Sequence, residues 1–148
     1  MMPTFRLQKL WTMKEKEKQA ALAEYEEALH KFEQAAEALY KLLKEKERCE
    51  AERDRRLQDG LAVGAIRHTL QYLANLQQTI DHYQLIVMRA REQMQRRQQR
   101  LIELNIEVKK YEKMQERVRL WIEQREKEAE SRLLDEIAVQ RFVRQGEL

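Results

Sequence analysis

The sequence predicts an all-α protein: a long antiparallel coiled-coil hairpin of two helices, with a C-terminal helix that extends beyond its partner. Three observations lead to this fold class. The chain of 148 residues contains one proline and is rich in Glu, Lys, Arg, Gln, Ala and Leu, which are strong helix formers. Apolar residues recur in heptads, and Gly60 and Gly64 interrupt an otherwise helical pattern. With 37% charged residues, this combination is typical of a coiled coil.

The first helix is expected over residues 4–58. Two apolar columns with a spacing of seven residues run along it, offset from each other by three residues, which is the a/d pattern of a coiled coil. The pattern weakens toward the N-terminus and again between Lys46 and Arg53. The predicted core residues of this helix are Leu22, Tyr25, Leu29, Phe32, Leu39 and Leu43.

The second helix is expected over residues 66–145, and its pattern is more regular. One column is apolar at seven consecutive heptad positions, which predicts a long helix whose apolar stripe packs against a partner. These predicted core residues are Ile66, Leu73, Ile80, Val87, Met94, Leu101 and Val108.

The segment 59–65 is predicted to form the tip of the hairpin. Asp59-Gly60 is a turn signal, and Gly60 can adopt the left-handed conformation that ends a helix. Gly64 then allows the chain to reverse. Because so few residues connect the helices, they are expected to be antiparallel neighbours in one domain that spans residues 1–148.

The pairing register predicts an unpaired C-terminal segment. Facing residues are expected to have numbers that sum to about 126, as for Leu39 and Val87, with a slip of one heptad left open. The first helix then ends opposite Trp121 or Ile122, and the rest of the second helix projects by about 35–40 Å. A frayed end is the alternative, but the large apolar residues favour a docking segment. The candidate contact residues are Trp121, Ile122, Leu133, Leu134, Ile137 and Phe142.

No pattern in the chain indicates catalysis. The three histidines are scattered, no metal-site spacing or Gly-rich phosphate loop is present, and the single Cys49 fits a reducing compartment. No apolar run reaches the length of a membrane span, and the N-terminus has no signal-peptide core. We therefore expect a soluble cytoplasmic protein that is not an enzyme, binds no metal or cofactor and does not insert into a membrane.

The segment "RAREQMQRRQQR", residues 89–100, contains five arginines and one glutamate. It could bind nucleic acid or an acidic protein surface, or it could be a solubilising helix face. The net charge of +3 and the absence of aromatic residues within the segment argue against nucleic acid as a partner.

A second candidate surface lies early in the second helix. Tyr72, Leu76, Thr79 and Tyr83 follow one another at spacings of four, three and four and widen the apolar face there. Leu76 and Tyr83 are also heptad positions, so the stripe could be core, a partner surface, or both.

Several strings in the chain together resemble the FliJ family of flagellar export proteins. These are "FRLQKLW" near the start, an early Glu-Tyr pair, "IRHTLQYLANL" after a glycine-containing tip, and "NIEVKKYEKM" later. The resemblance extends over essentially the full length. It implies a cytoplasmic component of the type III export apparatus that builds the flagellum, associated peripherally with the basal body at the inner face of the cell membrane.

The resemblance also implies partners and roles. Family members are coiled-coil stalks that insert into the hexameric export ATPase, promote its assembly and activity, and contact the membrane export-gate protein; some escort export chaperones. The family's gate-binding stripe maps onto Tyr72, Leu76, Thr79 and Tyr83, and the unpaired C-terminal segment suits insertion into a ring. The alternatives are a generic coiled-coil scaffold, including a homodimer, or a chaperone escort that does not activate the ATPase.

Overall fold

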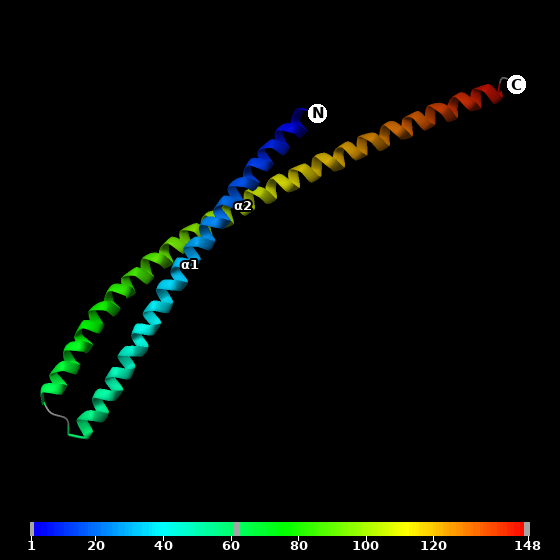
Figure 1. Cartoon of the computed structure of the whole chain (residues 1–148). Helices are drawn as coiled ribbons and strands as arrows, with labels where there is room; N and C mark the ends of the chain where they lie inside the picture. Colours follow the sequence, from blue (N-terminus) through cyan, green and yellow to red (C-terminus); the bar gives the residue numbers. More distant parts are fainter. Residues whose placement is uncertain (1, 61–62, 147–148) are drawn as a thin grey trace. The chain divides into compact units, whose positions relative to one another are not determined.

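The computed structural model describes residues 2–60 and 63–146, and it contains two long helices. Helix α1 spans Met2–Gln58 and helix α2 spans Val63–Gly146 (Figure 1). Every described residue is helical except Asp59 and Gly60, which form a turn. The two helices pack against each other as an antiparallel hairpin, so the predicted fold class is confirmed.

The turn after α1 is built as the Asp59-Gly60 signal suggests. Gly60 has a φ of 80°, a left-handed conformation that residues with a Cβ rarely adopt. The Asp59 backbone N–H donates to the Arg55 carbonyl oxygen at 3.2 Å and that of Gly60 to Leu57 at 3.4 Å, which closes the last turn of α1. Gly64 lies inside the first turn of α2, so α2 begins earlier than expected and the tip is shorter on that side. Residues 61 and 62 of the expected tip lie outside the described residues.

The chain divides into two compact units. The hairpin unit comprises Gln19–Glu103, and the terminal unit combines Met1–Lys18 with Leu104–Leu148. Each has a thin core, as expected where two helices share one line of contact. The buried apolar residues of the hairpin unit are Ala21, Cys49, Leu76 and Ile80, and those of the terminal unit are Leu7, Leu104 and Val108.

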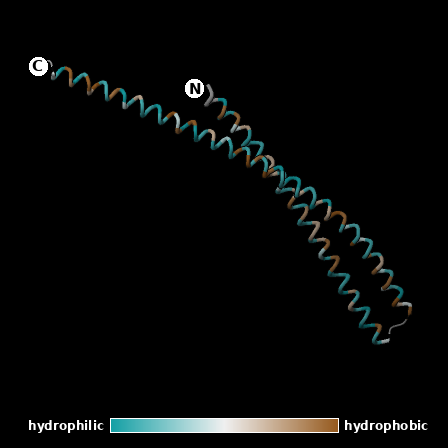
Figure 2. The backbone as a smooth tube through the Cα atoms, turned by 180° about the vertical axis from the view of Figure 1, so that it is seen from behind, coloured by the Kyte–Doolittle hydropathy of each residue, from teal (hydrophilic) through white to brown (hydrophobic). Residues whose placement is uncertain are grey.

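The seam of α2 lies where the sequence predicts it. Ile80 and Val108, both members of the predicted apolar column, are 1% exposed. The other five members of that column are half-buried. Figure 2 shows hydrophobic bands recurring along both helices, and they continue into the C-terminal part of α2.

One of the two predicted columns of the α1 seam is displaced by one position. The most deeply buried residues of α1, Leu7, Ala21 and Cys49, fall in one heptad column, each one position before the predicted column. Leu43 was expected in the core, but its side chain is 38% exposed, whereas Leu42 beside it is half-buried. The other predicted core residues of α1 are half-buried, and the second predicted column, with Tyr25, Phe32 and Leu39, completes the observed a/d pattern. Small alanines in the contact column allow the helices to approach closely, so the larger leucines flank the contact.

The register also differs from the first pairing scheme. Three polar pairs join the helices: Glu24 with Arg97, Glu45 with Tyr72, and Lys14 with Glu107. Their residue numbers sum to 121, 117 and 121 instead of 126. These values bracket the sum of about 119 that a slip of one heptad produces. The slip that the sequence left open is therefore close to the observed register.

In the terminal unit, a salt bridge occupies part of the seam. Lys14 stands at a contact position of α1, and its Nζ lies 3.0 Å from Glu107 Oε2 on α2. The hydrogen bond to Glu107, and a second one to Glu17, raise the pKa of Lys14 above its ordinary value of 10.5. The charged residue is thus accommodated where the apolar pattern of α1 weakens.

Candidate functional site

Two candidate surfaces follow from the sequence, one in each unit. The first is the tip stripe, which consists of Tyr72, Leu76, Thr79 and Tyr83. Leu76 is only 8% exposed, because it belongs to the α2 seam and faces α1. Tyr72 is 48% exposed, Thr79 is exposed and Tyr83 is half-buried. The stripe therefore combines one core residue with three residues that keep exposed surface.

Tyr72 connects the stripe to α1. Its phenol donates a hydrogen bond to Glu45 Oε1 at 3.1 Å. Glu45 also accepts bonds from Arg48, at 2.6 Å from Nη2 and 3.1 Å from Nε, and from the Cys49 thiol at 3.5 Å. These contacts lower the pKa of Glu45 to about 2, chiefly through Arg48, and the bond to Glu45 raises the pKa of Tyr72. The Tyr72 hydroxyl is therefore held against α1 while about half of the residue stays exposed.

Thr79 and Tyr83 offer apolar and aromatic surface. The Thr79 hydroxyl donates to the Asn75 carbonyl oxygen of its own helix at 3.2 Å, so its hydrogen bond is satisfied within α2. The His82 and Tyr83 rings meet edge to face with centroids 6.1 Å apart. The stripe thus ends in a small aromatic pair.

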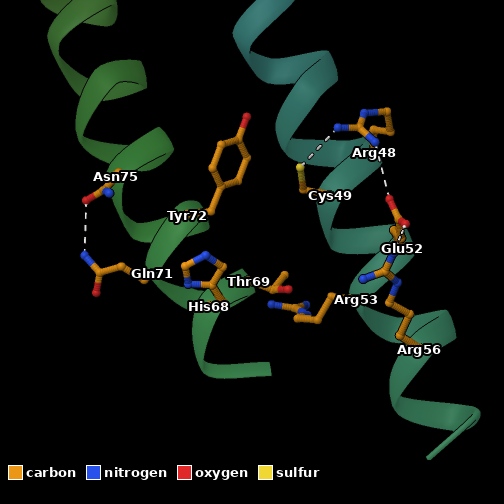
Figure 3. A pocket seen from close by; sticks show the side chains of 10 residues that line it. All are labelled: Arg48, Cys49, Glu52, Arg53, Arg56, His68, Thr69, Gln71, Tyr72 and Asn75. Atoms are coloured by element: carbon orange, nitrogen blue, oxygen red, sulfur yellow. Dashed lines mark hydrogen bonds and ion pairs between the residues drawn. The ribbon is translucent and has the colours of Figure 1, made fainter. Parts of the chain in front are cut away.

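A hollow between the helices adjoins the stripe and was missed by the sequence reasoning. It has a volume of about 420 Å³, and we call it the tip hollow (Figure 3). In Figure 3 the Tyr72 ring extends from α2 toward α1, and Arg53 extends from α1 toward α2. The lining residues are Arg48, Cys49, Glu52, Arg53, Arg56, His68, Thr69, Gln71, Tyr72 and Asn75. The available signal was the loss of apolar residues from the α1 pattern between Lys46 and Arg53.

Cys49 is buried in the wall of the tip hollow. Burial, followed by the hydrogen bond to Glu45, raises the pKa of its thiol above the ordinary value of 9.0. A thiol held in its protonated form is a poor nucleophile. Cys49 is therefore best understood as a small seam residue.

The second candidate surface is the overhang, residues 119–146 of α2. All of its residues are exposed, whereas Val118 just before it is half-buried. The unpaired segment thus begins close to the position that the sequence predicts. The six expected contact residues range from 37% exposed for Ile122 to 77% for Phe142. Leu120, Val139 and Val143 add further exposed apolar surface.

The apolar residues of the overhang are distributed around the helix. With 3.6 residues per turn, Trp121 and Val139 point to one side, and Leu133 and Ile137 point roughly 120–160° away. Leu134 and Phe142 fall on the remaining sides. The overhang therefore lacks the single a/d stripe that coiled-coil pairing requires.

Local interactions support the overhang as a single helix. Arg119 pairs with Glu123 at 2.8 Å and with Glu116 one turn earlier. The Arg125 guanidinium lies 4.5 Å from the centroid of the Trp121 ring. Such pairs at spacings of three and four residues stabilise an isolated helix.

The five arginines of residues 89–100 are all exposed. Of these five arginines, Arg97 alone forms an ion pair within the described residues, with Glu24 at 3.0 Å. The segment therefore remains available to a solvent or partner contact, and its role stays a prediction.

Neither a metal cluster nor a membrane-crossing helix was found in residues 2–60 and 63–146. The described part of the chain holds no group of three or more His, Cys, Asp or Glu residues placed to bind a metal ion. Neither helix, over those same residues, has a stretch long and apolar enough to cross a membrane.

Comparisons with known proteins test the resemblance. The family model for the flagellar FliJ protein matches residues 3–147. The chain belongs to the FliJ family. It is 42% identical over 142 residues to the flagellar FliJ protein of Bacillus subtilis (strain 168), a match that covers 96% of this chain and 97% of the relative. No solved structure matches significantly. Membership in the FliJ family confirms the resemblance and supports a role as a component of flagellar protein export.

Proposed function

We propose that this FliJ-family chain is the stalk of the flagellar export apparatus. In this role the overhang enters the central hole of the hexameric export ATPase and promotes its assembly and activity. The tip stripe binds the membrane export-gate protein and so links the ATPase to the gate. The chain acts by binding alone, in the cytoplasm at the base of the flagellum.

The arrangement of the overhang carries this proposal. A helix with apolar side chains on all sides is suited to an environment that surrounds it. A flat partner would cover only one side, and a second helix would need one continuous stripe. An enclosing ring would cover the sides of Trp121, Leu133 and Leu134 at once. The exposed apolar residues of the overhang thus favour insertion into a hole.

The tip stripe supports the second half of the proposal. Tyr72 and Thr79 present exposed surface beside a buried anchor, Leu76, and the hydrogen bond to Glu45 fixes the Tyr72 ring. A rigid aromatic residue beside small and apolar neighbours is typical of a protein-binding surface. A partner can therefore bind here without disrupting the seam.

The experiment that tests the proposal is the ATP hydrolysis rate of the cognate export ATPase with and without this chain. We expect the full chain to stimulate hydrolysis and the chain that ends at Trp121 to lose most of the stimulation. A triple variant, Leu133→Gln, Leu134→Gln and Ile137→Gln, should behave like the truncation, because it removes apolar contact and keeps the helix.

A matched control removes as much exposed apolar surface elsewhere. Met88→Gln, Ile102→Gln and Ile106→Gln alter three residues that are 46–52% exposed and lie before the overhang. This control should stimulate as the full chain does. If an ATPase that is competent to form hexamers is not stimulated by the full chain, the stalk role is wrong and a scaffold or chaperone-escort role is favoured. If the truncated chain stimulates fully, the contact lies outside the overhang.

A further inference from the structure

The tip hollow exists because polar residues occupy seam positions near the tip. Arg53 falls in the second α1 column, three heptads after Phe32, and its side chain is only 29% exposed. Thr69 occupies a seam position of α2 and lines the same hollow. Polar residues at such positions weaken a coiled coil. The seam is thus less well packed where it adjoins the tip stripe.

The charges around the hollow leave one guanidinium incompletely paired. Arg48 and Arg56 both bind Glu52, at 3.3 and 2.9 Å. Among the described residues, the polar contacts of Arg53 are with Asp54 alone, through Nε and Nη2 at 3.2 Å each, and the Asp54 side chain is 64% exposed. Within the described residues, Arg53 Nη1 forms no hydrogen bond. This half-buried guanidinium therefore retains a donor for an incoming acceptor.

The other wall of the hollow offers amides and an aromatic ring. Gln71 and Asn75 bind each other at 3.3 Å and line the hollow beside Tyr72. Such side chains can pair with a peptide backbone. Because Tyr72 belongs to both surfaces, a segment bound on the tip stripe would reach the hollow directly (Figure 3).

We propose that the tip hollow receives a carboxylate side chain of the partner segment that docks on the tip stripe, and that Arg53 pairs with it. The inference deepens the proposed gate-binding role and rests on it. Its occupant is an acidic peptide segment, and Arg53 is a specificity residue contributed by α1. A carboxylate matches the planar donor fork of a guanidinium.

Charge favours a carboxylate over a phosphate group. The hollow contains Glu52, which binds two of the three arginines and would repel a dianion. Arg53, already paired with the exposed Asp54, offers the Nη1 donor, which suits one carboxylate better than a dianion. A phosphate site would instead gather several unpaired basic groups or a row of backbone amides.

The test measures binding of the full chain to the cytoplasmic part of the cognate export-gate protein by isothermal titration calorimetry. Arg53→Gln should weaken binding about tenfold, the usual effect of losing a hydrogen bond to a charged group. Arg53→Lys keeps the charge but loses the fork and should weaken binding less. Circular dichroism melting of each variant checks that it folds.

The matched control is Arg67→Gln, which removes the same charge near the tip. Arg67 is exposed, does not line the hollow and forms no ion pair among the described residues. This variant should change binding less than about twofold, as expected for a peripheral exposed charge. The contrast between the two variants separates a specific pair from a general charge effect.

Three results would overturn the inference. First, the wild-type chain could bind and Arg53→Gln could bind as well as Arg67→Gln. Arg53 would then form no specific pair with a carboxylate, and the gate-binding role would stand. Displacement of the gate protein by inorganic phosphate at constant ionic strength, seen with the wild-type chain but not with Arg53→Gln, identifies a phosphate site instead. No binding by the folded wild-type chain refutes the gate-binding role, and the inference with it.

Discussion

At the scale of single residues, Glu45 shows how one carboxylate joins the helices beside the tip stripe. It accepts hydrogen bonds from Arg48 and Cys49 on α1 and from Tyr72 on α2. The Arg48 guanidinium is the largest cause of its low pKa, which is about 2 instead of the ordinary 4.5. The position of Tyr72 therefore depends on the ionised form of Glu45.

This network predicts a pH dependence of stability. A carboxylate with a lower pKa in the folded chain binds protons more weakly there than in the unfolded chain. Its stabilising effect is fully present above pH 4.5 and is lost as the pH falls toward 2. We expect Glu45→Gln to flatten the fall in melting temperature over this range, measured by circular dichroism.

The control for this prediction is Glu47→Gln. Glu47 is a neighbouring carboxylate with a 71% exposed side chain and one contact, at 3.6 Å, with Lys44 on its own helix. Its variant should retain the wild-type fall in melting temperature. A Glu45→Gln profile parallel to the wild-type one would show that the network does not stabilise the fold.

At the scale of the elements, the α1 seam is defined by small residues. Ala21 is 3% exposed, and Ala28 and Ala35 follow it in the same column as half-buried residues. Leu22 and Leu29 flank this column. Close packing of the helices thus depends on the absence of bulk at Ala21 and its equivalents.

The seam predicts opposite outcomes for two adjacent substitutions. Ala21→Leu forces a larger side chain into the contact and should lower the free energy of unfolding by about 1–3 kcal/mol. Ala20→Leu places the same side chain on an exposed position and should change it by less than about 0.5 kcal/mol. Urea denaturation measures both values. Similar losses in the two variants would contradict the observed α1 seam.

The two helices differ in how well the sequence predicted them. The α2 seam was predicted because β-branched and large residues such as Ile80 and Val108 hold one column. One α1 column was displaced by one position because a search for large apolar residues selects Leu22 over Ala21, and counting heptads from Leu22 then leads to Leu43 instead of Leu42. Residue size alone does not reveal that a close approach of helices favours alanine.

The overhang and the tip hollow also differ in how well the sequence predicts them. The overhang could be predicted, because it depends only on the two helix lengths and an approximate register. The tip hollow could not, because Arg53 and Tyr72 line one cavity only in a particular register, and that register differs from the first pairing scheme. A surface made by one helix can be read from its periodicity, whereas a surface made by two helices depends on their packing.

At the scale of the whole molecule, the two candidate surfaces belong to different units. The tip stripe and tip hollow are formed in the hairpin unit, and the overhang belongs to the terminal unit. No described residue of the overhang is buried against another part of the chain. Binding by the overhang and folding of the paired helices should therefore be separable.

This separation leads to a prediction for the chain that ends at Trp121. Because the removed residues make no buried contact, the truncated and full chains should melt within about 3 °C of each other, which corresponds to roughly 1 kcal/mol. Both melting temperatures should be independent of protein concentration, as expected for a hairpin that folds as a monomer.

A homodimeric scaffold predicts the opposite concentration dependence. If the overhang paired with a second copy, the melting temperature of the full chain would rise with concentration, and the truncation would abolish the rise. Circular dichroism melting of both chains over a hundredfold range of concentration, with sedimentation equilibrium as an independent measure of mass, distinguishes the two. A monomer that keeps its stability after truncation but no longer stimulates the ATPase would assign the apolar surface of the overhang to partner binding, because neither folding nor self-association would require it.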